Sequence, residues 1–271
     1  MINYYKKEYL PVFLFKIYIY FSFIGVGAIL FGIPFLNSEL FGDITNNLVL
    51  PVLLFVHAGH VMGYLRGLVF ITLSSLSGFL FEISGLRYGA LFNNPYVYNK
   101  GGLLIQGVPF NVVLYWGVFI YIGYSITNLL LSKFKNTPSN IFKKVMMDGI
   151  VVTSIDLLID PIGVMARNWV WLNGGFYFGV PFGNFVSWFF IVTIVTSIFR
   201  IYEYYKPNKI DIKKISVSIK VVPIKVYIVL FLIYCIYAFL LGLYKLLLVG
   251  TVPMLTIIVL FYYQNRVKNR G

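Results

Sequence analysis

Apolar stretches long enough to cross a bilayer occupy most of this 271-residue chain. A spanning helix needs about 20 apolar residues, and such stretches fall at residues 12–33, 45–65, 67–84, 107–131, 144–164, 182–202, 224–243 and 246–263. Apolar residues make up 59% of the chain and charged residues 11%, against about half and about a quarter in soluble domains. The sequence therefore excludes a soluble globular protein. It predicts an all-α polytopic transmembrane bundle of about eight helices, forming one integral-membrane domain over residues 1–271.

Local signals divide the apolar stretches. The break between the second and third helices is expected at Arg66-Gly67, and the break between the seventh and eighth at Gly242 and Lys245. Lys6 and Lys7 precede a segment of full spanning length with no small-residue cleavage pattern after it. The first helix is therefore expected to stay in the protein rather than leave as a signal peptide.

The basic residues indicate how the helices are oriented. The net charge is +13, from 22 Lys and Arg against nine Asp and Glu. With eight spans and a cytoplasmic N-terminus, four basic residues lie outside, Lys16 lies within the first helix, and the other seventeen lie inside. A seven-helix arrangement would put the C-terminal basic cluster on the wrong side. The excess charge thus predicts a multi-pass cell-membrane protein with both termini cytoplasmic, and no nucleic-acid partner.

Two loops share a pattern and predict an internal repeat. The first follows the third helix, from Glu82 to Asn99, and ends at Gly107-Val108-Pro109-Phe110 with Trp116 beyond. The second follows the fifth helix, from Asp160, and ends at Gly179-Val180-Pro181-Phe182 with Trp188 beyond. Helices three and four then correspond to helices five and six. Because a whole pair of helices separates the repeats, both loops should open on the same face.

Four of the nine acids lie within or at the ends of spanning segments. They are Glu82, Asp148, Asp156 and Asp160, whereas Glu8, Glu39, Asp43, Glu203 and Asp211 fall at helix ends or in loops and read as solvated. A charge at membrane depth costs about 2.5–3.5 kcal/mol, so buried acids usually face a cavity and serve function. Asp156 and Asp160 share a helical face. Close carboxyl groups in a dry pocket cannot all ionise, so one should keep its proton.

These acids also have structural interpretations. Asp160 precedes Pro161 and could simply end a helix, and Asp148 follows Lys143-Lys144, where an acid suits a helix N-terminus. His57 and His60 share a helical face and could relay protons, but no matching third and fourth ligands indicate a metal site. Cys235 is the only cysteine, so no disulfide framework or cysteine-based metal site is expected.

Carboxyl groups, aromatic rings and a pocket reached from lipid suit one kind of reaction. A neutral carboxylic acid can protonate an isoprenoid double bond and create a tertiary carbocation, which aromatic faces stabilise. A second carboxylate can then deprotonate a water as it adds. Such a hydration needs no redox cofactor and no metal.

The loop patterns also resemble those of a known family, the carotenoid-biosynthesis membrane proteins that include bisanhydrobacterioruberin hydratase and carotenoid 1,2-hydratases. The resembling residues are Glu82-Ile83-Ser84-Gly85, Tyr96-Val97-Tyr98, Gly107-Val108-Pro109, Asp156 to Pro161, Trp169-Val170-Trp171, Gly175 to Pro181, Asn184 and Trp188. The resemblance covers residues 50–200, which would form the catalytic core. It implies hydration of a terminal isoprenoid double bond to a tertiary alcohol, in a carotenoid such as a bacterioruberin precursor or in an archaeal ether lipid, as in hydroxyarchaeol-forming relatives.

The leading hypothesis is therefore a membrane isoprenoid hydratase. Glu82 and Asp160 are the expected acid and base pair in open order, Asp156 tunes them, and His57 and His60 are second choices for proton relay. The expected substrate-binding residues are Trp169, Trp171, Tyr177, Phe178, Asn184, Arg167 and Tyr96. Arg167 could bind an anionic head group, pair with Asp160 or lie in an interfacial aromatic belt. The expected partners are the isoprenoid substrate and membrane lipid.

Three alternatives stay open. Asp156-Leu157-Leu158-Ile159-Asp160 has the spacing of an aspartate-rich prenyltransferase motif, although such enzymes use two motifs and one is present. A cyclase or isomerase would use the same carbocation as a hydratase. A proton-coupled transporter or lipid-binding protein would use buried acids to relay protons, although its irregular segments would be expected at the midplane rather than at one face.

Overall fold

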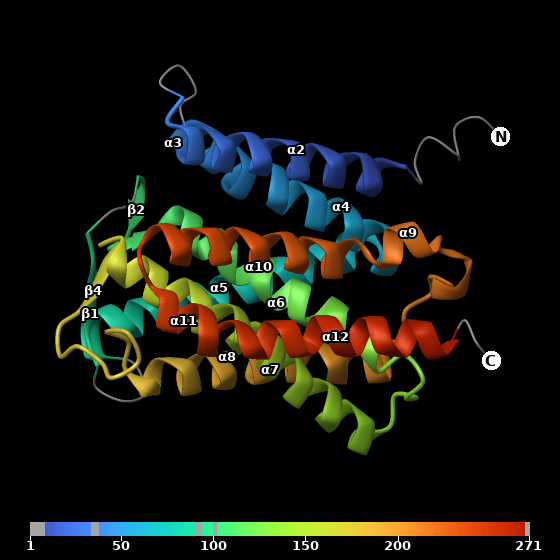
Figure 1. Ribbon diagram of the computed structural model, residues 1–271. Helices are drawn as coiled ribbons and strands as arrows, with labels where there is room; N and C mark the ends of the chain where they lie inside the picture. The colour runs from blue at the N-terminus through green and yellow to red at the C-terminus, as the bar shows by residue number, and fades with distance from the viewer. Residues whose placement is uncertain (1–8, 34–37, 90–93, 100–101, 269–271) are drawn as a thin grey trace.

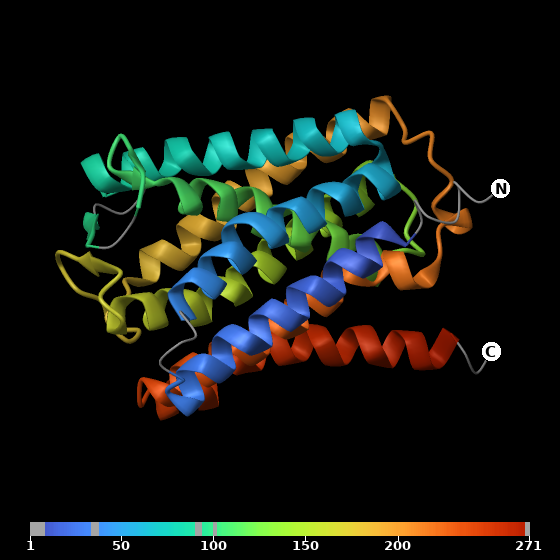
Figure 2. The ribbon, with the colours of Figure 1, turned by 90° about the horizontal axis from the view of Figure 1, so that it is seen from above.

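The computed structural model describes residues 9–33, 38–89, 94–99 and 102–268, which form a bundle of long, roughly parallel and antiparallel helices (Figures 1 and 2). In chain order the helices are α2 (Leu10–Phe31), α3 (Ser38–Asp43), the π-helix η1 (Ile44–Val49), α4 (Leu50–Met62), α5 (Tyr64–Tyr88), α6 (Phe110–Leu130), α7 (Pro138–Met165), α8 (Phe182–Tyr205), the short 3-10 helix η3 (Ile212–Lys214), α9 (Val217–Lys220), α10 (Val222–Leu240), α11 (Tyr244–Val249) and α12 (Thr251–Lys268). The strands β1 (Tyr96–Tyr98), β2 (Leu104–Ile105), β3 (Val108–Pro109) and β4 (Trp169–Trp171) lie in the loops.

The helices match the eight predicted segments. Among the described residues, seven helical segments are long and apolar enough to cross a membrane, beginning with Leu10–Phe31 and ending with Tyr244–Gln264. The eighth predicted segment is α7, which is 28 residues long but carries two lysines and three aspartates. It packs against both α6 and α8, and four of its five charged residues are buried, whereas Lys143 near its start is exposed. The all-α polytopic bundle is confirmed.

Two glycines mark the helix breaks. The chain turns between α4 and α5 at Gly63, with φ 91° and ψ 143°, rather than at Arg66-Gly67, which lie inside α5. A residue with a Cβ rarely adopts such a positive φ, so this glycine is the break. The predicted break at Gly242 is confirmed, since it follows α10 with φ 71°.

The two ends of the bundle differ in chemistry. At one end, called the hairpin end, α5 and α7 finish, α6 and α8 begin, and all four strands lie (Figure 1). The opposite end, called the basic end, holds η3, α9, the start of α2 and the finish of α12 (Figure 1). Its described basic residues include Arg66, Lys133, Lys206, Lys213 and Lys220. The first spanning helix thus begins, and the last one ends, at the same end of the bundle, as an even number of spans requires.

The internal repeat is visible in the fold. Gln106-Gly107 and Phe178-Gly179 are both two-residue turns, with φ 53° and 86° in the first and 52° and 86° in the second. These are the values of a type I′ hairpin turn. Each turn leads through a buried valine into a proline that caps the next helix, α6 or α8. The expectation that both loops open on one face is confirmed.

The repeats also meet each other symmetrically. Strand β1 pairs antiparallel with β4, so that Val97 lies opposite Val170 and Tyr96 opposite Trp171. Below them the rings of Trp116 and Trp188, which occupy matching positions in α6 and α8, stack at 4.2 Å between centroids. Both contacts join equivalent elements of the two repeats.

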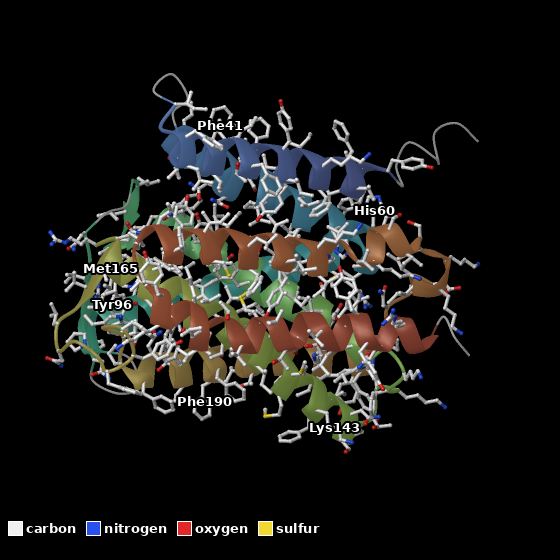
Figure 3. The ribbon with its side chains drawn as sticks, in the orientation of Figure 1. Phe41, His60, Tyr96, Lys143, Met165 and Phe190 are labelled. Carbon is white, nitrogen blue, oxygen red and sulfur yellow. The ribbon has the colours of Figure 1, made fainter. Side chains whose placement is uncertain are left out.

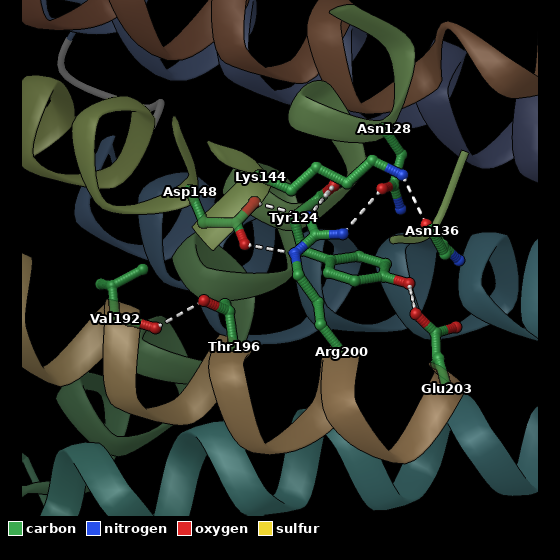
Figure 4. Close-up of polar contacts among 9 residues, drawn as sticks. All are labelled: Tyr124, Asn128, Asn136, Lys144, Asp148, Val192, Thr196, Arg200 and Glu203. Atoms are coloured by element: carbon green, nitrogen blue, oxygen red, sulfur yellow. Dashed lines mark hydrogen bonds and ion pairs between the residues drawn. The ribbon is translucent and has the colours of Figure 1, made fainter. Parts of the chain in front are cut away.

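A polar network joins α6 to the first part of α7 and the last part of α8, away from the hairpin end, and Figure 4 shows its contacts. Arg200 donates from Nε and Nη2 to the two carboxyl oxygens of Asp148, both at 2.7 Å. It also donates to Asn128 at 2.9 Å and lies over the ring of Tyr124. The tyrosine hydroxyl in turn donates to Glu203. Asp148 is therefore the partner of Arg200 in a buried ion pair. Glu203 is half-buried and hydrogen-bonded rather than solvated as expected.

Candidate active site

Glu82 is buried near the end of α5 and surrounded by hydrogen-bond donors. The residue is 4% exposed, and its carboxyl group accepts three hydrogen bonds. The Tyr96 hydroxyl donates to Oε2, the Tyr98 hydroxyl donates to the same oxygen at 2.7 Å, and Trp116 Nε1 donates to Oε1 at 2.9 Å. The two tyrosines come from β1 and the tryptophan from α6, so the loop and the next helix both hold this acid.

Small residues on α5 make these contacts possible. Gly78 and Gly85 lie four and three residues from Glu82, on the same face of the helix. A Cβ placed on Gly78 would lie 2.0 Å from Cγ of Trp116, and one on Gly85 would lie 2.7 Å from the ring of Tyr96. Both distances are shorter than real carbon contacts. The glycines therefore let two of the donors reach the carboxyl group.

Asp156 and Asp160 form a second acid site on α7. They are 0% and 7% exposed, and one amide group joins them. Asn184 Nδ2, at the start of α8, donates to Oδ2 of Asp156 at 2.9 Å and to Oδ2 of Asp160 at 2.5 Å. Oδ1 of Asp156 is buried without a hydrogen-bond partner among the described residues. The expected shared face of the two aspartates is confirmed.

Pro161 lies inside α7 rather than after it. The interpretation of Asp160 as the end of a helix is therefore wrong, since the helix continues to Met165. A proline has no N–H to donate to the carbonyl four residues earlier, which here belongs to Leu157. The hydroxyl of Tyr177 donates to that carbonyl at 3.3 Å. The second loop thus compensates the proline and fixes the helix next to the acids.

Tyr96 lies between the two acid sites. Burial raises the pKa of its hydroxyl well above the ordinary value, and the charges of Glu82 and of Asp160 raise that pKa further. Burial also raises the pKa of Tyr98 in the same way. Both tyrosines therefore stay protonated at any physiological pH, and they remain donors to Glu82.

A small, partly enclosed cavity is lined by a donor from each acid site, Tyr96 and Asn184, but by none of the three acids themselves. It is lined by Phe81 of α5, by Gly89 directly after α5, by Asn94, Tyr96 and Trp171 of the loops, and by Gly183, Asn184 and Ser187 of α8. The volume that the centre of a water molecule can occupy is about 10 Å³, which is about what one water needs. Trp171 is 8% exposed, and its Nε1 has no hydrogen-bond partner in the described part of the chain. The cavity therefore lies between a donor to Glu82 and a donor to the aspartates, and can hold a polar molecule of this size.

The comparison with known families now adds to this geometry. Residues 43–257 match a family described as carotenoid biosynthesis protein. The chain belongs to the carotenoid biosynthesis protein family. The match runs from the end of α3 into α12, so it contains Glu82, Asp156, Asp160 and both loops, and it extends beyond the expected 50–200 core. No curated protein and no solved structure matches the sequence.

Several of the predicted site residues lie near Glu82, Asp156 and Asp160. Tyr96, Trp171 and Asn184 line the cavity. Trp169 packs on Gly163 and on the ring of Tyr98, and Tyr177 packs against Phe185. Phe178 occupies the positive-φ position of its turn, where it contacts Tyr177 rather than the cavity.

Other predicted residues lie apart from the acids. His60 lies toward the basic end and Tyr96 at the hairpin end (Figure 3). His57 is buried, with Nδ1 2.6 Å from the Tyr121 hydroxyl and Nε2 3.1 Å from the Ile219 carbonyl of α9. The structure thus does not bring the histidines to the carboxyl groups. Arg167 is exposed, and the ion pair that the described residues form is Arg200 with Asp148, not Arg167 with Asp160.

Sequence reasoning did not single out Tyr98, Trp116 or Ser187 as site residues. Tyr98 and Trp116 nevertheless lie within the repeated pattern, and the repeat position of Trp116 was the signal that could have identified it. Nothing local in the sequence marks Ser187. In the described part of the chain, no group of three or more His, Cys, Asp or Glu side chains is arranged to hold a metal ion.

Proposed function

We propose that the protein is a membrane-embedded isoprenoid hydratase, which adds water across a double bond of a carotenoid precursor or an unsaturated prenyl ether lipid to give a tertiary alcohol. The observation that carries the proposal is a water-sized cavity lined by Tyr96, which donates to Glu82, and by Asn184, which donates to the aspartates. Membership of the carotenoid biosynthesis protein family supports an isoprenoid substrate.

The chemistry requires an acid, a base, and a surface that tolerates a carbocation. One carboxyl group protonates the CH carbon of a trisubstituted double bond, and the positive charge forms on the neighbouring tertiary carbon. Water adds to that carbon while a second carboxylate removes its proton. Tyr96 and Trp171 line the cavity, and their aromatic rings can stabilise the cation without forming a bond to it.

The apolar substrate can approach from the membrane. The cavity has room for one water, so the isoprenoid end must approach along the helices that form its walls. The outward faces of α5 and α8 carry exposed apolar side chains, including Leu76, Leu80, Phe190 and Ile194. We propose that the chain end inserts between these two helices at Phe81, which lines the cavity from α5.

Product analysis tests this proposal. The protein is expressed in cells that make an acyclic carotenoid with terminal isopropylidene groups, and separately in cells that make a geranylgeranyl ether lipid. We expect one extract to gain a product heavier by one water, and growth in H₂¹⁸O to place ¹⁸O in a tertiary hydroxyl. A cyclised or rearranged product of unchanged mass would instead indicate a cyclase or isomerase. Diphosphate release that requires Mg²⁺ would indicate a prenyltransferase, and proton-coupled uptake without any new product a transporter.

We also propose that the basic end lies in the cytoplasm and the hairpin end on the opposite side of the cell membrane. The excess of lysine and arginine at the basic end supports this orientation. A reporter enzyme that folds only in the cytoplasm should be active when fused after Gly271. The same reporter inserted after Leu172, in the second hairpin loop, should be inactive. The reverse pattern would contradict the orientation.

A further inference from the structure

The two acid sites differ in how many donors each oxygen atom receives. Glu82 receives three donors at its two oxygens, namely the hydroxyls of Tyr96 and Tyr98 and the indole N–H of Trp116. Hydrogen bonds to the charged form of a buried carboxyl group favour that form. Tyr96, Tyr98 and Trp116 therefore stabilise Glu82 as a carboxylate, the form that can accept a proton.

The aspartate site has the opposite balance. A single amide nitrogen serves both aspartates, and Oδ1 of Asp156 has no partner within the described ranges. If both ionised, two buried negative charges would share one neutral donor. The described residues place no cation there, since Arg200 is bonded to Asp148 two turns earlier in α7 and Arg167 is exposed. Two close carboxyl groups in such a site hold one proton between them.

We propose that the Asp156–Asp160 pair is the acid that protonates the double bond and that Glu82 is the base that takes the proton from the attacking water. This inference rests on the proposed hydratase function and adds the direction of proton transfer. One water-sized cavity is lined both by Tyr96, which donates to Glu82, and by Asn184, which donates to the two aspartates. A water there lies next to Trp171, whose buried Nε1–H has no other acceptor among the residues that the structure describes.

The protons balance over the proposed catalytic cycle. The carboxylic O–H of the pair breaks and a C–H bond forms at the CH carbon of the alkene, which leaves the pair fully ionised and a tertiary carbocation. The water oxygen bonds to the cation as one of its O–H bonds breaks toward Glu82. The product is the tertiary alcohol. Return of the proton from Glu82 to the pair, through the solvent that refills the cavity, restores both groups.

Isotope exchange separates the two roles. In D₂O the pair carries deuterium, adds it to the alkene, and can remove hydrogen again from the same carbon without any help from Glu82. Recovered substrate then gains deuterium at that vinylic position. We expect Glu82→Gln to keep this exchange near the wild-type rate while hydration falls about 10²-fold or more. We expect the double variant Asp156→Asn with Asp160→Asn to lose both exchange and hydration.

A milder variant controls for loss of activity through misfolding. Tyr98→Phe keeps the Glu82 carboxyl group and removes one of its donors, so hydration should fall while exchange persists. Two results would overturn the assignment of roles while leaving the enzyme a hydratase. One is exchange that persists in the aspartate double variant. The other is loss of exchange in both Glu82→Gln and Tyr98→Phe. A wild-type protein that yields neither alcohol nor exchange would instead reject the proposed function itself.

Discussion

Asp160→Asn and Glu82→Gln should each lower the rate of tertiary-alcohol formation by about 10²- to 10⁴-fold, the usual contribution of a positioned acid or base. Each amide has nearly the size and shape of the acid it replaces, but neither can donate or accept the proton that the reaction moves. In Asp160→Asn, the new amide keeps a side-chain oxygen to which Asn184 can still donate, so the fold should persist. The measurement is product per unit of membrane-inserted protein.

The control for this pair is Asp211→Asn. Asp211 is exposed, and its side chain accepts a hydrogen bond from the Lys213 backbone N–H at 3.0 Å. Asparagine caps a helix about as well as aspartate does, so this variant should match the wild type in insertion and in rate. Full activity in both Asp160→Asn and Glu82→Gln would exclude them as the acid and base.

Gly78→Ala should damage the site without touching a carboxyl group. The new Cβ would lie 2.0 Å from Cγ of Trp116, which is 1% exposed and stacked on Trp188. Because that ring is already tightly enclosed, either it or α5 must move. Overpacking of this kind destabilises a fold by about 1–3 kcal/mol. Displacement of Trp116 also removes a donor from Glu82, and misplacing a reacting group by about 1 Å can lower the rate about 10²-fold.

Gly27→Ala is the matched control. Gly27 lies in α2, another spanning helix, and a Cβ there would meet nothing within 4 Å among the described residues. Alanine favours a helix over glycine by about 1 kcal/mol, so this variant should be as stable as the wild type or more so. Thermal unfolding in detergent and the hydration rate give the two readouts. Equal behaviour of the Gly78 and Gly27 variants would show that the Trp116 contact is not needed.

The sequence predicted the parts of the fold that depend on short stretches of chain. Spanning length and apolar content identified the eight helices, because a helix in lipid must satisfy its own backbone and present apolar side chains. The break at Gly63 was misplaced, because Arg66-Gly67 looked more polar while only the backbone conformation identifies the turning residue. The repeat was found because both copies need the same Gly-Val-Pro signal for the same turn.

The candidate site was predicted in part for the same reason. A four-residue spacing places Asp156 and Asp160 on one face wherever α7 lies, and membrane depth alone made Glu82 unusual. Asp148 satisfied the same criteria, yet its partner Arg200 is 52 residues away on α8. A sequence pattern cannot separate a paired acid from an unpaired one when the partner comes from another helix.

By itself, then, the sequence determined the membrane bundle, its repeat and which acids are buried, because these follow from hydrophobicity, charge and spacing within single helices. Only the tertiary structure decided what each acid contacts. Trp116 and Glu82 are 34 residues apart in the sequence, and Asn184 and Asp156 are 28 residues apart. Such contacts depend on how neighbouring helices pack. The unequal supply of donors to the two acid sites arises from that packing.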